Sequence, residues 1–105
     1  MERFAWKAKL LPGAKTEYIK RHDEVWPEMT ELLNKAGIHN YSIWITGDEI
    51  FGCYEAEKGN DYASSVQAKS PIVDRWNEYM KDVMVMEKDP QTGTHYQLEQ
   101  VFYHP

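Results

Sequence analysis

Four segments of the sequence alternate between apolar and polar residues, as β-strands with one buried face do. They are residues 3–11, 40–46, 50–57 and 96–103. Stretches with helical spacing lie between the first and second segments and between the third and fourth. The order along the chain is therefore strand, helices, strand, strand, helices, strand. Such a chain must join its strands through two long crossovers and one central hairpin.

The helical stretches carry recognisable start signals. The spacing predicts a helix over residues 14–22 and a second one from about residue 23 or 24 to residue 36. In the later stretch we expect a short helix over residues 61–69. A further helix should open at Ser70-Pro71, a capping residue followed by proline at the first helical position. We expect this helix to have a broad apolar face formed by Ile72, Val73, Trp76, Tyr79, Met80, Val83 and Met84. Residues 87–95 are predicted to form a loop.

Two right-handed crossovers interlocked through a hairpin predict a four-stranded antiparallel sheet with helices on one face, a ferredoxin-like α+β fold. The other face of the sheet must be covered by water, a ligand or another subunit. Tyr41 and Trp44 point to opposite sides of their strand, so one of them must face a surface outside the main core. We expect a homodimer in which two sheets pack face to face, a dimeric α+β barrel.

Size and charge exclude several classes of protein. The chain has 105 residues, and we expect one domain over residues 1–105. A formal charge of −5, with no basic run longer than Lys20-Arg21, argues against nucleic acid as a partner. No apolar run approaches the roughly 20 residues that span a bilayer, and residues 1–4 lack the core of a signal peptide. We therefore expect no membrane partner and a soluble, intracellular protein.

Residues 18–28 hold the densest group of reactive side chains: a phenol, an imidazole, two cations, three carboxylates and an indole. If residues 14–21 form a helix that reaches His22, then Tyr18 and His22 project from one face, four residues apart. An imidazole with a reference pKa of about 6.5 can give or take a proton near neutral pH, and a neighbouring phenol can orient a hydroxyl-bearing ligand. The alternative is a structural pair, in which the tyrosine ring simply packs on a capping or core histidine.

Other kinds of chemistry lack support in the sequence. The glycines form no phosphate-binding loop, the serines lie in no nucleophile elbow, and Cys53 is the only cysteine. The histidines, at positions 22, 39, 95 and 104, do not have the spacing of a metal site. We therefore expect a pocket that uses neither a cofactor nor a metal. Tyrosine, tryptophan and histidine side chains suit a sugar, whose C–H groups stack on rings while its hydroxyls meet polar groups. The alternative is that these rings form the core of the dimer.

Much of the chain resembles one known family. The segments that carry the resemblance are residues 18–28, 37–43, 75–80 and 98–103, of which the most specific is the Y-x-x-R-H-x-x-x-W-P-E string of the first. They are similar to the L-rhamnose mutarotase family. The resemblance implies a cytoplasmic dimer that interconverts the α and β anomers of L-rhamnose without a cofactor. It also implies that His22 is the proton donor and that Tyr18, Tyr41 and a tryptophan pair at positions 76 and 77 bind the sugar.

This chain has Trp76-Asn77 at the position of that tryptophan pair. An asparagine amide can pair with a hydroxyl, but it removes an apolar wall. The substrate is therefore expected to be L-rhamnose or a related deoxyhexose. Two further hypotheses remain at this stage: a dimeric α+β-barrel binding or haem- and monooxygenase-like module without mutarotase activity, and a purely structural dimer.

Overall fold

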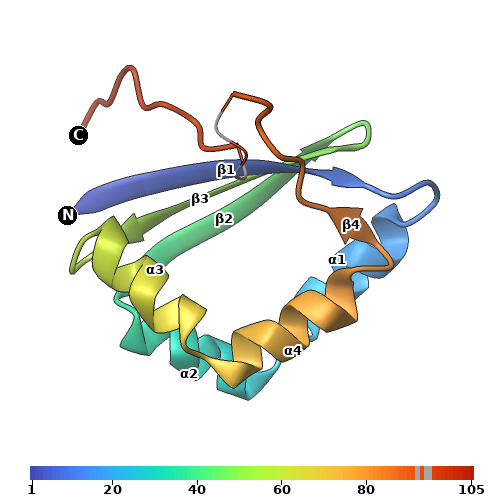
Figure 1. Cartoon of the computed structure of the whole chain (residues 1–105), viewed down its shortest axis with the longest axis horizontal. Helices are drawn as coiled ribbons and strands as arrows, with labels where there is room; N and C mark the ends of the chain where they lie inside the picture. Colours follow the sequence, from blue (N-terminus) through green and yellow to red (C-terminus); the bar gives the residue numbers. More distant parts are fainter. Residues whose placement is uncertain (92, 94–95) are drawn as a thin grey trace.

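The computed structural model describes residues 1–91, 93 and 96–105. Its sheet has four antiparallel strands in the order β2-β3-β1-β4, and the helices lie together on one side of it (Figure 1). The elements are β1 (Glu2–Leu10), α1 (Lys15–Asp23), α2 (Pro27–Lys35), β2 (Ile38–Thr46), β3 (Glu49–Ala56), α3 (Asn60–Ala68), α4 (Pro71–Met80) and β4 (Met84–Val85). The ferredoxin-like α+β fold expected from the sequence is confirmed.

Proline and serine residues determine where two of the helices begin. Pro27 and Pro71 occupy the first turns of α2 and α4, where a missing N–H removes no helical hydrogen bond. The Ser70 hydroxyl caps α4 by accepting a hydrogen bond from the N–H of Ile72 at 3.2 Å. The backbone of Trp26 is extended, as the residue before a proline tends to be. The second helix therefore begins at Pro27, later than the sequence pattern predicted.

The helix-covered face of the sheet forms two separate hydrophobic clusters. The buried residues of the first are Ala8, Leu10, Ala14, Tyr18, Ile50, Met80 and Val83. Those of the second are Ala36, Ile38, Tyr54, Ala56 and Ala63. Tyr18 and Met80 in the first cluster and Tyr54 in the second also line a cavity between the sheet and the helices. The core is thus divided, and a cavity lies between its two parts and the sheet.

A β-bulge interrupts β2 where it pairs with β3. Three steps along β2, from His39 to Ser42, face only two steps along β3. Asn40 lies in the bulge at a φ of 51°, a left-handed conformation that asparagine tolerates better than most residues. Its side-chain amide donates a hydrogen bond to the carboxylate of Glu55. Because the extra residue reverses the alternation along β2, Tyr41 points toward the helices and into the cavity.

The end of the chain differs from the sequence-based expectation. The prediction of a closing strand over residues 96–103 is wrong, because only Gln97 of this segment forms a bridge to β1. The rest of the segment runs over the side of the sheet opposite the helices (Figure 1). The fourth strand is instead Met84–Val85, which pairs with Lys9 and Leu10 at the end of β1.

The extent of α4 was also predicted wrongly. The helix ends at Met80, so Val83 and Met84, which the apolar pattern had included, lie in a turn and in β4. Consecutive apolar residues fit a helix and a strand equally well, and pairing with β1 decides between them. Of the predicted loop over residues 87–95, positions 92, 94 and 95 lie outside the described residues; the others belong to no helix or named strand.

We predict that Asn40→Gly is more stable than Asn40→Ala. Both variants lose the amide that binds Glu55, but the left-handed conformation costs alanine about 1–2 kcal/mol and glycine almost nothing. Urea titration should therefore give a free energy of unfolding about 1 kcal/mol higher for the glycine variant. Ser42→Gly and Ser42→Ala form the matched control pair. At that ordinary strand position alanine should be the more stable by roughly 0.5–1 kcal/mol. If the same one of the two substitutions, glycine or alanine, were the more stable at both positions, the role of the bulge would be contradicted.

Candidate active site

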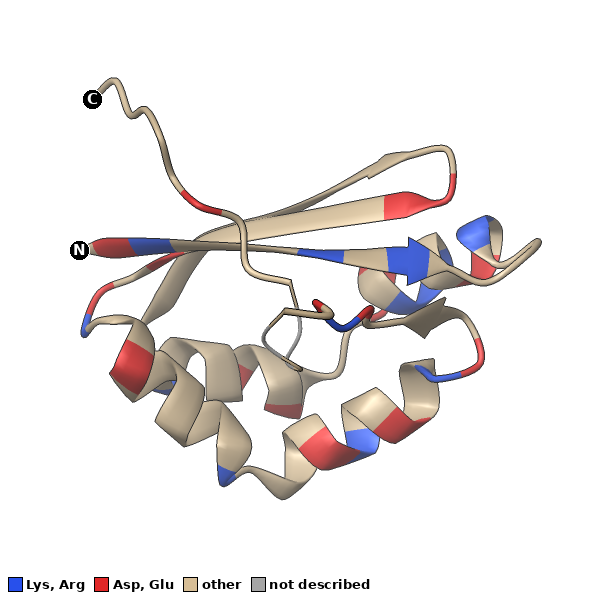
Figure 2. Cartoon of the chain, turned by 45° about the horizontal axis from the view of Figure 1, so that its top comes forward, with Lys and Arg blue, Asp and Glu red and all other residues tan. Residues whose placement is uncertain are grey.

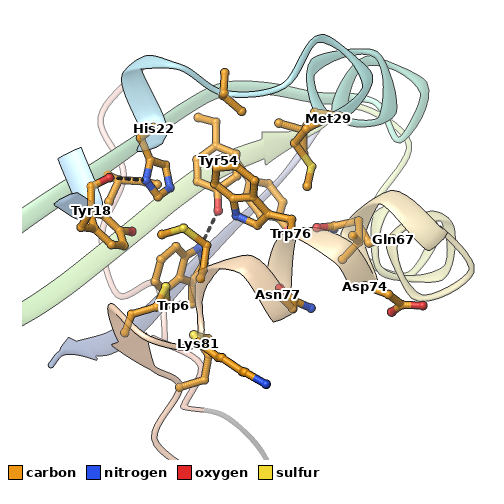
Figure 3. A pocket seen from close by; sticks show the side chains of 18 of the residues that line it. Trp6, Tyr18, His22, Met29, Tyr54, Gln67, Asp74, Trp76, Asn77 and Lys81 are labelled. Carbon is orange, nitrogen blue, oxygen red and sulfur yellow. Dashed lines mark hydrogen bonds between the residues drawn. The ribbon is translucent and has the colours of Figure 1, made fainter. Parts of the chain in front are cut away.

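A cavity of about 1160 Å³ lies between the sheet and the helices (Figure 3). Strands β1, β2 and β3 supply one wall, and all four helices supply residues to the others. The lining is mainly apolar and aromatic with a few polar groups, which is typical of small-molecule sites. The five residues singled out from the sequence, Tyr18, His22, Tyr41, Trp76 and Asn77, all line this cavity.

His22 lies in the last turn of α1, and one of its ring nitrogens, Nε2, has no hydrogen-bond partner among the described residues. Its Nδ1 lies 3.0 Å from the backbone carbonyl oxygen of Tyr18. A carbonyl can only accept, so Nδ1–H is the donor and the neutral ring has its lone pair on Nε2. Burial lowers the pKa of the imidazole below its ordinary value, although the bond to the Tyr18 carbonyl raises it slightly. At neutral pH His22 is therefore an uncharged imidazole that can accept a proton at Nε2.

Tyr18 lies four residues before His22, and the two rings face each other with centroids 4.3 Å apart. The tyrosine is 2% exposed. Its hydroxyl group is buried and makes no hydrogen bond to any residue in the described part of the chain. Burial raises the pKa of this phenol above its ordinary range, so it stays protonated. A buried hydroxyl without a protein partner costs free energy, and a ligand hydroxyl in the cavity would satisfy it.

Tyr41 approaches the cavity from β2, on the sheet side. Its hydroxyl oxygen accepts a hydrogen bond from Trp6 Nε1 at 2.9 Å. The side chain as a whole is partly exposed, but protein atoms surround the hydroxyl group, and this burial raises its pKa to about 12. The bond from Trp6 acts in the opposite direction and lowers the pKa. Tyr41 is therefore a neutral phenol at physiological pH.

Trp76 closes the cavity from α4. Its ring meets the ring of His22 edge-on at 5.4 Å, and meets Trp26 edge-on at 5.2 Å. These contacts hold the indole beside the imidazole and leave it partly open to the cavity. Asn77, the next residue, lines the same cavity but is more exposed. The structure thus assembles the stacking surface and the amide that the sequence places side by side.

Arg21 belongs to the same sequence string as His22 but does not line the cavity. Its guanidinium binds Asp82 at 2.8 Å, the carbonyl oxygen of Tyr79 at 2.7 Å and Glu17 at 3.2 Å. It thereby ties α1 to the end of α4, a helix along which residues of both charges alternate (Figure 2). Neighbouring positions of a helix point in different directions, so one turn of α1 supplies both a residue that contacts the end of α4, Arg21, and a residue that lines the cavity, His22.

Several lining residues were not identified from the sequence, and among them are three that carry a polar group. Trp6, Tyr54 and Gln67 reach the cavity from β1, β3 and α3. The alternation along residues 3–11 placed Trp6 on the buried face, but nothing in that pattern indicated a polar contact with Tyr41. Tyr54 packs against Phe4 at 5.2 Å and lies 5.1 Å from the Tyr41 ring. Together with Tyr41 on β2, Trp6 and Tyr54 extend the site across three strands.

Two further observations bear on the expected chemistry. Among the described residues, no three His, Cys, Asp or Glu side chains come together as a metal site would require. No helix in the described part of the chain is long and apolar enough to cross a membrane. What the cavity does present is one imidazole, four phenols and two indoles, which can move protons and stack on a ligand.

The fold and the cavity define a small α+β protein with its candidate site between the sheet and the helices. A family model described as L-rhamnose mutarotase matches residues 3–104. An L-rhamnose mutarotase from Jannaschia sp. (strain CCS1) is 37% identical over 91 residues, covering 85% of this chain and 86% of the relative. One from Formosa agariphila is 38% identical over 104 residues, covering 98% of both chains. The chain belongs to the L-rhamnose mutarotase family.

Solved structures agree with this assignment. The crystal structure of an L-rhamnose mutarotase from Formosa agariphila is similar over 100% of both chains, with a TM-score of 0.78 and 34% identity. Tetracenomycin F2 cyclase from Streptomyces glaucescens, a type-II polyketide cyclase, gives a TM-score of 0.66 at 18% identity over 99% of this chain and 96% of its own. The second likeness concerns the fold alone.

Proposed function

We propose that the protein is an isomerase that interconverts the α and β anomers of L-rhamnose or a related deoxyhexose. The observation that carries the proposal is a partly buried histidine with a free Nε2, beside two phenols in one cavity. Family membership favours this activity over a binding-only, haem- or monooxygenase-like module. Because the reaction requires only proton transfer, we propose that it proceeds without a cofactor. We also propose that it takes place in the cytoplasm, which fits a family of sugar-metabolising enzymes.

In the proposed reaction His22 carries a proton in both directions. Its Nε2 takes the proton of the anomeric hydroxyl while the ring oxygen gains one and the bond between C1 and the ring oxygen breaks. The aldehyde turns about the bond between C1 and C2 and closes on its other face. The imidazolium then donates its proton to the carbonyl oxygen, which becomes the new anomeric hydroxyl. The donor role that the family resemblance implies for His22 thus belongs to ring closure, because its lowered pKa leaves it neutral at rest.

The two phenols and the indole are proposed to hold the sugar. The unpartnered hydroxyl of Tyr18 can bind one sugar hydroxyl beside His22. Tyr41 approaches from the sheet side, and the Trp76 ring offers a face on which the C–H groups of the sugar can pack. A sugar bound in this way lies between the sheet and α4 with its anomeric carbon near the imidazole.

His22→Ala is expected to reduce the enzyme-dependent rate of anomer exchange by about 10²–10⁴-fold, the usual contribution of one positioned acid–base group. Saturation-transfer NMR on L-rhamnose measures this rate directly. His39→Ala is the matched control, since His39 is exposed and pairs with Glu57 outside the cavity. Exchange by His22→Ala as fast as that of the unmodified protein would remove this residue from the mechanism.

Asn77 is proposed to set how strongly the site prefers a deoxy sugar. We predict that Asn77→Trp raises the ratio of kcat/KM for L-rhamnose over L-mannose by about tenfold, within the range for one small apolar contact. The added indole would contact the methyl group that distinguishes L-rhamnose, whereas the asparagine amide can pair with the extra hydroxyl of L-mannose. Arg75→Trp adds an indole to α4 outside the cavity lining and should leave the ratio unchanged. An unchanged ratio in Asn77→Trp would count against this role.

We propose that the protein forms a homodimer through the open face of the sheet, the face opposite the helices. Trp44 lies on this face and is 68% exposed, while Phe51 and Cys53 lie beside it. The C-terminal segment, residues 98–105, runs over the same side and exposes Val101 and Phe102 to 85% and 80%. Apolar side chains so exposed in one region support burial against a second copy.

Sedimentation equilibrium is expected to give a mass of twice the 12.4 kDa of one chain. Trp44→Asp should shift the protein toward the monomer, because it places a charge in the apolar interface. Tyr62→Asp changes an exposed aromatic residue on α3, on the helix side, and should leave the dimer intact. A monomeric mass for the unmodified protein at micromolar concentration would overturn the proposal.

A further inference from the structure

Trp6 contacts Tyr41 across an intervening strand. Trp6 lies on β1 and Tyr41 on β2, and β3 runs between these strands in the sheet. The residue of β3 that pairs with Trp6 is Gly52. A Cβ atom at position 52 would lie 2.3–2.5 Å from the Cε2, Cζ2 and Nε1 atoms of the indole. Only a residue without a side chain lets the indole cross β3 here.

The crossing indole determines how the Tyr41 hydroxyl can bond. Trp6 Nε1–H can only donate, so the Tyr41 oxygen accepts at 2.9 Å. The phenol retains its own proton and, within the described part of the chain, has no acceptor for it. With one lone pair occupied from the sheet side, the O–H group of this cavity-lining phenol remains available to a ligand.

Such a hydroxyl supplies what the proposed reaction still lacks. His22 accepts the proton of the anomeric hydroxyl, but the ring oxygen needs a donor at the same time. Tyr41 has the Trp6 N–H donor fixed on its oxygen, and that donor stabilises negative charge on the oxygen, as a hydrogen bond with Gln67 does for Tyr54. No metal or cofactor is required for this role, because the proton comes from the phenol itself.

Resting on the proposed mutarotase function, we propose that Trp6 is a positioning residue that holds Tyr41 as the proton donor to the ring oxygen, and that Gly52 provides the space for it. During ring opening, Tyr41 gives its proton to the ring oxygen while His22 takes the anomeric proton. During closure, the former ring oxygen attacks the aldehyde and returns its proton to the Tyr41 phenolate. The imidazolium gives its proton to the carbonyl oxygen, so both residues end as they began.

Trp6→Phe keeps a ring over Gly52 but lacks the N–H group. It is expected to lower kcat by about threefold to tenfold, as the loss of one hydrogen bond does, with KM changed less than kcat. Gly52→Ala should have an effect at least as large, since the methyl group displaces the indole. Thermal unfolding followed by circular dichroism identifies any variant that fails to fold.

The decisive measurement is a double-mutant cycle with Tyr41→Phe. If Trp6 acts through Tyr41, Trp6→Phe changes kcat only when the Tyr41 hydroxyl is present and has no further effect in the Tyr41→Phe protein. Independent, multiplying effects in the two backgrounds would overturn the proposal. Trp44→Phe is the matched control: Trp44 is a tryptophan of the same sheet on the opposite face, and its replacement should leave kcat unchanged.

A binding measurement separates this proposal from the proposed function. If the unmodified protein and His22→Ala exchange anomers equally, the mutarotase assignment fails. Calorimetric titration with L-rhamnose then still tests the contact. Trp6→Phe should weaken binding by about twofold to tenfold in the unmodified background and not in the Tyr41→Phe background. Equal weakening in both backgrounds, or none in either, would show that Trp6 does not position Tyr41.

Discussion

Large aromatic side chains keep the sheet and the helices apart. Trp6 and Tyr54 rise from the sheet, Tyr18 and Trp76 come from the helices, and the cavity lies between them (Figure 3). Close packing is reached instead in two clusters, one of which includes three alanines, Ala36, Ala56 and Ala63. The atoms that line an open cavity lose dispersion contacts on one side. The fold therefore gives up some stability in order to hold a site in its interior.

One turn of α1 then converts this hollow into a chemical site. The four-residue spacing puts Tyr18 and His22 on the same face, and it also brings the His22 ring within 3.0 Å of the Tyr18 carbonyl. A single local contact thus sets both the orientation of the imidazole and the nitrogen that remains free. Arg21, one position earlier, points elsewhere and ties the same turn to Asp82 after α4. Arg21 therefore holds this turn of α1 in place, while His22 of the same turn lines the cavity.

The sequence predicted the features that local periodicity controls. Strands β1, β2 and β3 and the Ser70 cap were expected because alternation and capping are visible within a few residues. The last strand was misplaced, since residues 96–103 alternate but make one bridge to β1, whereas the two residues of β4 are too few to show a period. Strand pairing, rather than pattern, decides between such segments.

Within the site, the same distinction separates what was predicted from what was missed. The residues that α1 and α4 bring to the cavity share helical spacing or adjacency. Alternation put Tyr41 and Trp44 on opposite sides of their strand but did not decide which of them faces the cavity. The bulge at Asn40 and the crossing of Trp6 over Gly52 were not foreseen. Both depend on which strands become neighbours, and no segment of the sequence records that by itself.

The proposed proton transfers fit two groups, His22 and Tyr41, that carry no charge at rest. Burial lowers the pKa of His22 and raises that of Tyr41 to about 12, so both groups are neutral near pH 7. Charging either one alone in an apolar cavity would be costly. If the two protons move together, an imidazolium and a phenolate form as a pair and offset each other, and ring closure discharges both. Burial makes each group hard to ionise alone. It therefore favours a concerted reaction in which Tyr41 gives a proton to the sugar while His22 takes one from it, so that the sugar stays neutral.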